Sequence, residues 1–224
     1  MILEVLTVII AAYLIGSVPF GYLIVKLTSG DDIRQLHSGR TGGTNTMRSA
    51  GFGAGLLTAA MDILTAAGTV VLAQQFPAFE NPWLLIIVPL IVIVGNNHSI
   101  FLISRDQDGK MQFGGGAGGA VCTGGAIGLW WPSGIIIILV GILVFFFIGY
   151  ASVTTMWIAL GATLIFAYRA SALDAPWAYA AYGMIAEGML LLSLRPNIKR
   201  LIKGTERLHG FRARQMNKQA NQSS

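Results

Sequence analysis

Long hydrophobic runs alternate with short polar blocks along the chain and predict about seven membrane-spanning helices. Each run is close to the roughly 17–25 residues that a helix needs to cross a bilayer. The runs cover residues 3–27, 51–74, 83–103, 115–131, 134–150, 152–168 and 176–194. The pattern predicts an all-α integral membrane protein, with a single multi-span domain at residues 1–210 and a polar tail at residues 211–224.

Some of these runs leave alternatives open. The fourth is weakly hydrophobic, because glycine occupies eight of the fifteen positions from Gly114 to Gly128. The fifth and sixth are joined by only a few residues, so they form either two helices or one bent segment. The first is not expected to be a cleaved signal peptide, since it is too long and carries Glu4 where a basic region would stand.

Lys and Arg residues are concentrated in three segments, at residues 26–48, 105–110 and 195–218. With seven spans, all three segments share one face of the membrane, and only Arg169 lies on the other. Because basic residues mark the cytoplasmic side, we expect an external N-terminus and a cytoplasmic C-terminus. The net charge of +5 then faces anionic headgroups and cytosolic metabolites, and it does not by itself indicate a nucleic-acid partner.

Composition favours a membrane protein over a soluble one. The chain of 224 residues is 54% hydrophobic and 11% charged, with a mean hydropathy of +0.65, whereas a soluble domain carries about 25% charged residues. Its one cysteine, Cys122, permits no disulfide within the chain. No metal site is expected, because no Cys/His ligand spacing surrounds His37, His98 or His209.

Three polar blocks on the inferred cytoplasmic face carry the candidate chemistry. They are "HSGRTGGTNTMR" (37–48), "GNNHSIFLISRDQDGKMQFGGGAGGAVCTGG" (95–125) and "RPNIKRLIKGTERLHG" (195–210). Glycines let backbone N–H groups approach an anion, while hydroxyl and guanidinium groups add donors and charge, a combination that suits phosphate. Small residues also let membrane helices pack closely, and the glycine run alone does not separate the two roles.

The three blocks together resemble the motifs of the bacterial acyl-phosphate:glycerol-3-phosphate acyltransferases (PlsY), a family of small seven-helix membrane enzymes of phospholipid synthesis. They are similar to the family patterns G-S-G-N-x-G-A-T-N-x-x-R, G-H with F-x-G-G-K-G-x-A, and H-R-x-N-I-x-R-L-x-x-G-T-E. The matching positions are Ser38, Gly39, Gly42, Thr44, Asn45, Arg48, His98, Phe113, Gly115, Gly116, Gly118, Ala120, Arg195, Asn197, Ile198, Arg200, Leu201, Gly204, Thr205 and Glu206. The order and spacing of the blocks agree over nearly the whole chain.

The resemblance implies transfer of a fatty acyl group from acyl phosphate to glycerol 3-phosphate, giving 1-acylglycerol 3-phosphate (lysophosphatidate) and phosphate. It implies no cofactor, and neither coenzyme A nor acyl carrier protein as donor. The two substrates and membrane lipids are the expected partners, with the site on the cytoplasmic side of a bacterial cell membrane. Since an acyl phosphate has a good leaving group, positioning and charge stabilisation matter more than a strongly activated nucleophile.

The resemblance also assigns candidate site residues. Ser38 and Arg48 are expected to contact phosphate or acyl-phosphate oxygens, and His98 to act as a proton relay or as a hydrogen-bonding brace. The substrate-binding candidates are Arg40, Thr44, Asn45, Lys110, Gly115, Gly116, Gly118, Gly119, Ser152, Asn197, Arg200 and Glu206. The glycines are expected to cradle a phosphate through backbone amides, and Asn197 and Glu206 to orient the acceptor. Ser152 either lies near the site or only caps a helix.

The chain departs from the family pattern at several charged positions. In the second helix the family has D-x-x-K-G, which this chain matches only at Asp62, with Thr65 in place of the lysine. Ala117 replaces the lysine of G-G-K-G, and Leu194 replaces the histidine that opens the third pattern. Two cations expected near the substrate phosphate are therefore missing. Arg40, which replaces an asparagine, and Lys110 are the nearest substitutes along the sequence.

A second hypothesis is that these losses leave a weakened relative that binds anionic lipid or phosphate and serves as a membrane partner protein. The missing lysines favour it, whereas the enzyme is favoured by the retained Ser38, Arg48, Asn197 and Glu206. A transporter is a third hypothesis, because Asp62 and Glu187 lie inside hydrophobic runs, although no internal repeat of the kind common in transporters is found. Asp62 is otherwise expected to pair with a motif arginine such as Arg48.

Overall fold

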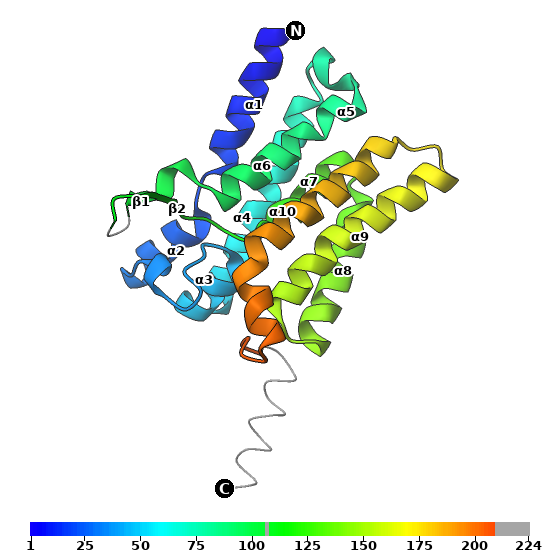
Figure 1. Ribbon diagram of the computed structural model, residues 1–224. Coiled ribbons are helices and arrows are strands. Elements are labelled where there is room, and N and C mark those ends of the chain that lie inside the picture. Colours follow the sequence, from blue (N-terminus) through cyan, green and yellow to red (C-terminus); the bar gives the residue numbers. More distant parts are fainter. Residues whose placement is uncertain (106–107, 209–224) are drawn as a thin grey trace, which may run out of the picture.

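Helices make up most of the computed structural model, which describes residues 1–105 and 108–208 (Figure 1). The α-helices are α1 (Ile2–Gly16), α2 (Phe20–Ser29), α3 (Gly43–Ala50), α4 (Phe52–Ala73), α5 (Pro82–Leu85), α6 (Ile87–Asn97), α7 (Gly119–Leu129), α8 (Pro132–Phe147), α9 (Ala151–Ala172) and α10 (Trp177–Ile202). Short 3-10 helices are η1 (Ile33–Gln35), η2 (Pro77–Glu80) and η3 (Ile100–Leu102), and a small antiparallel hairpin joins β1 (Ile103–Arg105) to β2 (Met111–Phe113). Apart from that hairpin, the all-α prediction is confirmed; the predicted tail at 211–224 lies outside the described residues.

Five helical segments in the described ranges are long and apolar enough to cross a membrane: Ile2–Ser29, Phe52–Ala73, Pro82–Leu102, Ala151–Ala172 and Trp177–Ile202. Two further apolar helices, α7 and α8, have 11 and 16 residues. The prediction of a multi-span membrane protein is therefore confirmed. The count of seven stays a prediction, because two of the seven helices are shorter than a full crossing.

The fifth and sixth hydrophobic runs form two separate helices rather than one bent segment. α8 ends at Phe147 and α9 begins at Ala151, and Gly149 between them has a φ of +81°. Glycine adopts this left-handed conformation readily, so the chain can reverse there. The two helices then run side by side (Figure 1).

The first hydrophobic run is broken into two helices at residues 17–19. α1 ends at Gly16, and Pro19, which has no N–H to donate, precedes α2. At the break α1 touches α6 directly, because a Cβ on Gly16 would lie 2.5 Å from the carbonyl oxygen of Val92. Ser99 Oγ donates to the carbonyl oxygen of Ser17 at 2.5 Å. α2 therefore leaves the direction of α1 and lies beside α3 (Figure 1).

Glycines of α7 place this short helix at the centre of the bundle. A Cβ on Gly124 would lie 2.2 Å from the carbonyl oxygen of Ile63, so α4 approaches the backbone of α7 closely. From α10, the buried Tyr182 donates its hydroxyl to the carbonyl oxygen of Cys122 at 2.7 Å. The helical part of the glycine-rich run therefore serves close packing, and Cys122 is a buried free thiol.

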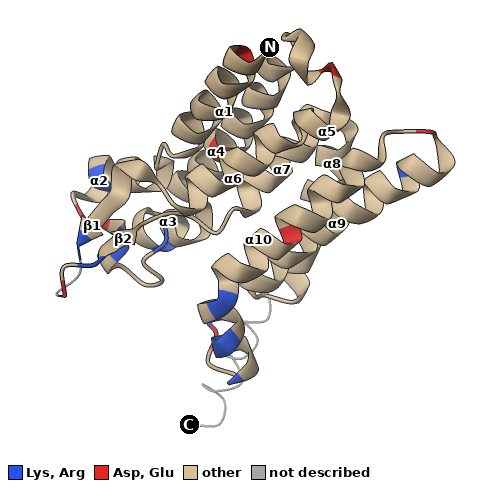
Figure 2. Cartoon of the chain, turned by 45° about the horizontal axis from the view of Figure 1, so that its top comes forward, with Lys and Arg blue, Asp and Glu red and all other residues tan. Residues whose placement is uncertain are grey.

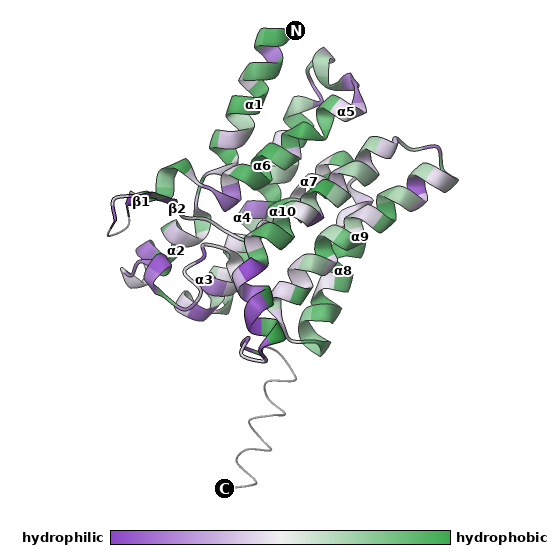
Figure 3. Ribbon diagram, in the orientation of Figure 1, coloured by the Kyte–Doolittle hydropathy of each residue, from purple (hydrophilic) through white to green (hydrophobic). Residues whose placement is uncertain are grey.

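Lys and Arg residues gather at one end of the bundle, around α2, α3, the hairpin and the end of α10 (Figure 2). Polar residues concentrate at this basic end, while apolar residues cover most of the remaining length of the helices (Figure 3). Among the basic residues of 1–105 and 108–208, only Arg169 lies at the opposite end, in the last turn of α9. Its guanidinium carbon lies 3.9 Å from the ring centroid of Trp130, a cation–π contact.

Candidate functional site

A cleft of about 240 Å³ lies at the basic end, between the loop that precedes α3 and the end of α10. Its lining residues are His37, Ser38, Arg48, Asn197, Arg200, Thr205, Glu206 and Arg207. The candidates predicted from sequence among them are Ser38, Arg48, Asn197, Arg200 and Glu206. The first and third polar blocks, which are far apart along the chain, therefore meet in one cleft.

Asn45, in the first turn of α3, holds the loop that carries Ser38. Its side chain is 4% exposed. Its Nδ2 donates to the carbonyl oxygens of Arg40 at 2.7 Å and Leu36 at 3.2 Å, and its Oδ1 accepts from the Ser38 N–H at 3.4 Å. Both the donor and the acceptor of the Asn45 side-chain amide therefore hold the loop in shape. Thr44, next to it, is half-buried, and neither residue lines the cleft.

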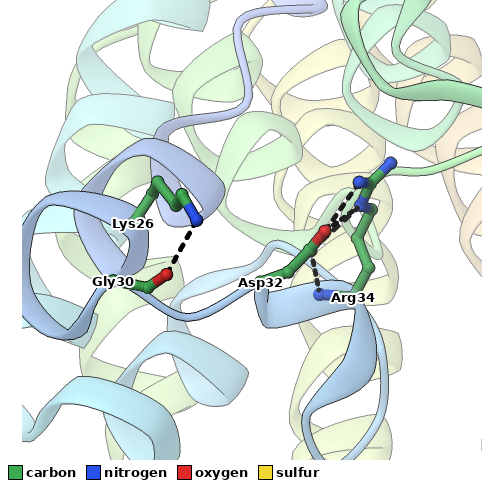
Figure 4. A network of polar contacts seen from close by, with 4 residues as sticks. All are labelled: Lys26, Gly30, Asp32 and Arg34. Atoms are coloured by element: carbon green, nitrogen blue, oxygen red, sulfur yellow. Dashed lines mark hydrogen bonds and ion pairs between the residues drawn. The ribbon is translucent and has the colours of Figure 1, made fainter.

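A second set of contacts fixes the start of this loop (Figure 4). The Arg34 guanidinium donates to the Asp32 carboxylate at 2.6 Å, and Asp32 also accepts from the Arg34 N–H at 3.0 Å. The side-chain hydrogen bond from Arg34 holds the pKa of Asp32 below its usual value. Just before it, Lys26 Nζ donates to the carbonyl oxygen of Gly30 at 2.7 Å, where α2 ends and Gly30 has a φ of +77°. The turn between α2 and the loop is therefore held on both sides.

Three guanidinium groups and one carboxylate face the cleft. Burial lowers the pKa of Arg48, and the positive charges of Arg207 and Arg200 lower it further, while Glu206 opposes the shift. With three arginines and one carboxylate in its lining, the cleft has a surplus of positive charge that an anion would neutralise. Because arginine binds phosphate through paired N–H groups, the electrostatics of the cleft suit a phosphate group.

Glu206 is held by hydrogen bonds from α9 and α10. Ser152 Oγ, buried at the start of α9, donates to Glu206 Oε2 at 2.7 Å, and Asn197 Nδ2 donates to Oε1 at 3.4 Å. Asn197 Oδ1 is buried and has no hydrogen-bond partner among the described residues. A buried acceptor of this kind, in the wall of a cleft, can take a hydrogen bond from a substrate hydroxyl.

Gly115 and Gly116, from the second polar block, are packed against the end of α6. The Gly116 N–H donates to the carbonyl oxygen of Asn96 at 2.8 Å. A Cβ on Gly115 would lie 2.4 Å from the carbonyl oxygens of both Asn96 and Asn97, so a side chain at Gly115 would force the segment away. The glycines here therefore allow two stretches of backbone to touch.

The predicted amide cradle over Gly115–Gly119 is only partly open to a ligand. The N–H of Gly116 is already engaged within the protein. Gly118, with a φ of +86°, precedes the first turn of α7, and Gly119 is the first residue of that helix. None of the four candidate glycines belongs to the lining of the cleft, so their contact with a phosphate stays a prediction.

The guanidinium of Arg40 is directed to protein oxygens. Its Nη1 donates to the carbonyl oxygen of Gly116 at 3.1 Å and to Ser193 Oγ at 2.8 Å, and its Nη2 donates to the carbonyl oxygen of Ser193. Burial lowers the pKa of Arg40, and the charge of Arg200 adds to the shift. Arg40 is not among the residues that line the cleft.

His98 and Lys110 also lie apart from the cleft lining. His98 ends α6; its ring meets the Phe113 ring edge-on at a centroid distance of 6.3 Å, and its carbonyl oxygen accepts from Tyr13 Oη at 3.0 Å. Lys110 is exposed just before β2, in a hairpin that projects away from α10 (Figures 1 and 2). Their predicted roles in catalysis and binding stay predictions.

The expected ion pair between Asp62 and Arg48 is absent from the described part of the chain. Asp62 is buried on α4, whereas the charges that act on Arg48 come from Arg200 on α10 and from Glu206 and Arg207 just after it. Sequence reasoning missed Arg207 as a lining residue, although it directly follows the third motif. It also missed Ser193, whose contact with Arg40 leaves no sequence signal.

Similarity to known proteins identifies the family to which this chain belongs. The family model described as "Glycerol-3-phosphate acyltransferase" matches residues 6–204. The chain belongs to this family. "Glycerol-3-phosphate acyltransferase 2" of Moorella thermoacetica is 34% identical over 213 residues, which cover 93% of this chain and 99% of that protein. "Glycerol-3-phosphate acyltransferase" of Rubrobacter xylanophilus is also 34% identical, over 94% of this chain and 98% of its own length.

Two solved structures extend this acyltransferase family likeness to three dimensions. Crystal structures of PlsY (YgiH), described as an integral membrane glycerol 3-phosphate acyltransferase, match this chain in two forms. The glycerol 3-phosphate form has a TM-score of 0.78 at 26% identity and covers 92% of this chain and 96% of its own. The lysophosphatidic acid form has a TM-score of 0.76 at 25% identity. The shared fold thus spans nearly the whole of this acyltransferase-family chain.

Proposed function

We propose that this protein transfers a fatty acyl group from acyl phosphate to glycerol 3-phosphate, releasing inorganic phosphate and 1-acylglycerol 3-phosphate. The observation that carries the proposal is the cleft at the basic end, where Arg48, Arg200 and Arg207 surround a single carboxylate. Its positive surplus suits phosphate, which both substrates contain. Membership of the acyltransferase family supports this chemistry over anion binding alone.

In the proposed reaction the cleft residues bind and orient, and the acyl phosphate supplies the leaving group. Ser38 and Arg48 contact phosphate oxygens, and Arg200 and Arg207 add charge. Asn197 Oδ1 accepts a hydrogen bond from an acceptor hydroxyl. The hydroxyl oxygen forms the new ester bond to the acyl carbon, the bond from that carbon to the phosphate oxygen breaks, and the departing phosphate takes the hydroxyl proton. Arginine groups stabilise the negative charge that collects on the leaving phosphate.

We also propose seven crossings of a bacterial inner membrane, with the N-terminus outside and the cleft on the cytoplasmic side. The two short helices α7 and α8 supply the crossings beyond the five long segments. The gathering of Lys and Arg at one end supports this orientation. A water-soluble glycerol 3-phosphate then enters from the cytoplasm, while the fatty chain of the donor stays between the helices.

The test is an assay of purified protein in detergent with palmitoyl phosphate and glycerol 3-phosphate. We expect stoichiometric release of phosphate and 1-palmitoylglycerol 3-phosphate, and no product when palmitoyl-coenzyme A or palmitoyl-acyl carrier protein replaces the acyl phosphate. The Arg48→Ala protein is the background control. Binding of glycerol 3-phosphate without turnover would refute the enzymatic proposal and support a weakened, ligand-binding relative.

A further inference from the structure

Arg40 joins the three polar blocks of the chain at one point. It lies in the loop of the first block, donates to the carbonyl oxygen of Gly116 in the second, and donates to both oxygens of Ser193, two residues before the third. The neighbouring Thr41 N–H adds a parallel bond to the carbonyl oxygen of Gly115 at 3.1 Å. The loop, the glycine segment and α10 are therefore tied together around one half-buried side chain.

The position of Ser193 on α10 explains what the contacts from Arg40 do. Pro196 lies inside the helix and has no N–H, so the carbonyl oxygen four residues earlier, on Leu192, loses its usual helical donor. A proline also bends a helix and loosens the hydrogen bonds around it; α10 bends in its last turns (Figure 1). The carbonyl oxygen of Ser193 is in this loosened turn, and the Arg40 guanidinium supplies it with a charged donor.

The part of α10 beyond the bend carries most of one wall of the cleft. Asn197 and Arg200 lie within one turn after Pro196, and Glu206 follows where the helix has ended. The direction that α10 takes at Pro196 therefore decides where these groups lie relative to Ser38 and Arg48.

We propose that Arg40 is a positioning residue: it donates to the Ser193 carbonyl group in the turn that Pro196 loosens, fixes the bend of α10, and thereby sets the far wall of the cleft. It does not contact the substrate phosphate. The expected loss of activity rests on the proposed acyltransferase function, whereas the expected change in structure does not. An arginine at this position is a departure from the family pattern given above.

The first test compares Arg40→Lys with Arg40→Ala in the palmitoyl phosphate assay. A lysine has no planar fork and cannot serve both Ser193 and Gly116, so both variants should lose activity alike, with kcat lower by about tenfold to a hundredfold. The KM for glycerol 3-phosphate, and its dependence on salt, should change little. A large rise in KM for Arg40→Ala that Arg40→Lys largely restores would show a direct phosphate contact and overturn the proposal. Lys199→Ala, an exposed cation of α10 outside the cleft lining, is the matched control.

The second test removes the reason for the cap. Pro196→Ala restores a backbone N–H, so the carbonyl oxygen of Leu192 regains its helical donor and the turn around Ser193 is no longer loosened. In the double variant Arg40→Ala/Pro196→Ala, we expect a much smaller loss of kcat than the two single variants would give if their effects simply added. Strict additivity would mean that Arg40 does not act through the bend, and it would overturn the proposal.

A structural readout separates this inference from the proposed function. In hydrogen–deuterium exchange of the full chain in detergent, Arg40→Ala should speed exchange in residues 193–203 and 114–118, while α4 should exchange as in the wild type. Unchanged exchange in those two segments would overturn the tie even if activity fell. Conversely, if the wild-type protein fails to turn over acyl phosphate but Arg40→Ala still speeds exchange in these segments, the function is refuted and the Arg40 contacts are supported.

Discussion

Ser38 and Arg48 reach the same cleft from a loop and from the last turn of α3. In a partly buried site, a charge-assisted hydrogen bond to a phosphate oxygen is much stronger than in water. We therefore expect Ser38→Ala and Arg48→Ala each to lower kcat/KM for the transfer by about 10²-fold or more. Steady-state kinetics with palmitoyl phosphate and glycerol 3-phosphate measure the loss.

Neighbouring residues of α10 provide the control for charge. Arg200 lines the cleft, whereas the adjacent Lys199 does not. Arg200→Ala should weaken turnover, and Lys199→Ala should leave it near the wild-type value. Full activity in both Ser38→Ala and Arg48→Ala would remove the loop from the site.

Asn45 should matter for stability as well as for activity. In Asn45→Asp the side chain keeps its shape but loses both donors, and it brings a carboxylate against the carbonyl oxygens of Arg40 and Leu36. Leaving such buried acceptors unpaired costs about 1–3 kcal/mol, so thermal unfolding in detergent should shift to a lower temperature. Gln35→Ala, an exposed change in the same region, should leave the Tm unchanged. A wild-type Tm for Asn45→Asp would contradict the loop-holding role.

At single positions, the motif pattern and the shared membrane face predicted which residues come together. Ser38, Arg48 and Glu206 do line one cleft, while their contacts with substrate stay predictions. Asn45 matched the same pattern, yet its side chain shapes the loop, since a motif does not separate a residue that touches a ligand from one that holds the chain. The partners of Arg40 depend on how α10 bends, which no local pattern reveals.

At the scale of the helices and the segments between them, the clearest prediction concerns Gly115 in the segment before α7. Gly115→Ala would put a Cβ 2.4 Å from two carbonyl oxygens of α6, closer than the 3.0 Å that real Cβ contacts respect. The segment must move, so activity and Tm should both fall. Gly68→Ala, in the middle of α4 with no atom near its Cβ, is the matched control. Its Tm should stay the same or rise, because alanine favours a helix by up to about 1 kcal/mol over glycine. Equal effects of the two changes would refute the close packing at Gly115.

Hydrophobic runs predicted where helices lie but not where they begin, break or end. α10 continues to Ile202, beyond the predicted end at 194, because hydropathy marks the part in lipid while a helix can extend into water. The break between α1 and α2 was missed because both halves are apolar, although Pro19 was a signal. The β1–β2 hairpin was missed because strands of three residues are too short to show an alternating pattern.

For the whole molecule, the proposed orientation predicts where each terminus lies. We expect the C-terminus at Ser224 to be cytoplasmic and the N-terminus at Met1 to be outside, because the basic end then faces inward. Fusions of each terminus to green fluorescent protein, which reports the cytoplasm, and to alkaline phosphatase, which reports the outside, measure both locations in a bacterial host. Termini that report from the same side would require an even number of crossings and would refute the seven-helix topology.

The shortness of α7 has a consequence for the chain that precedes it. Its 11 residues measure about 16 Å along the axis, roughly half of the ~30 Å hydrocarbon layer. In the seven-crossing arrangement that we propose, the polar chain before α7 therefore lies below the headgroups, where the helices around it shield it from lipid. A donor with its tail among the acyl chains could then present its phosphate without leaving the bilayer. We expect faster turnover in vesicles of 14-carbon than of 22-carbon phosphatidylcholine, and equal rates would show that turnover does not depend on how deep this chain lies.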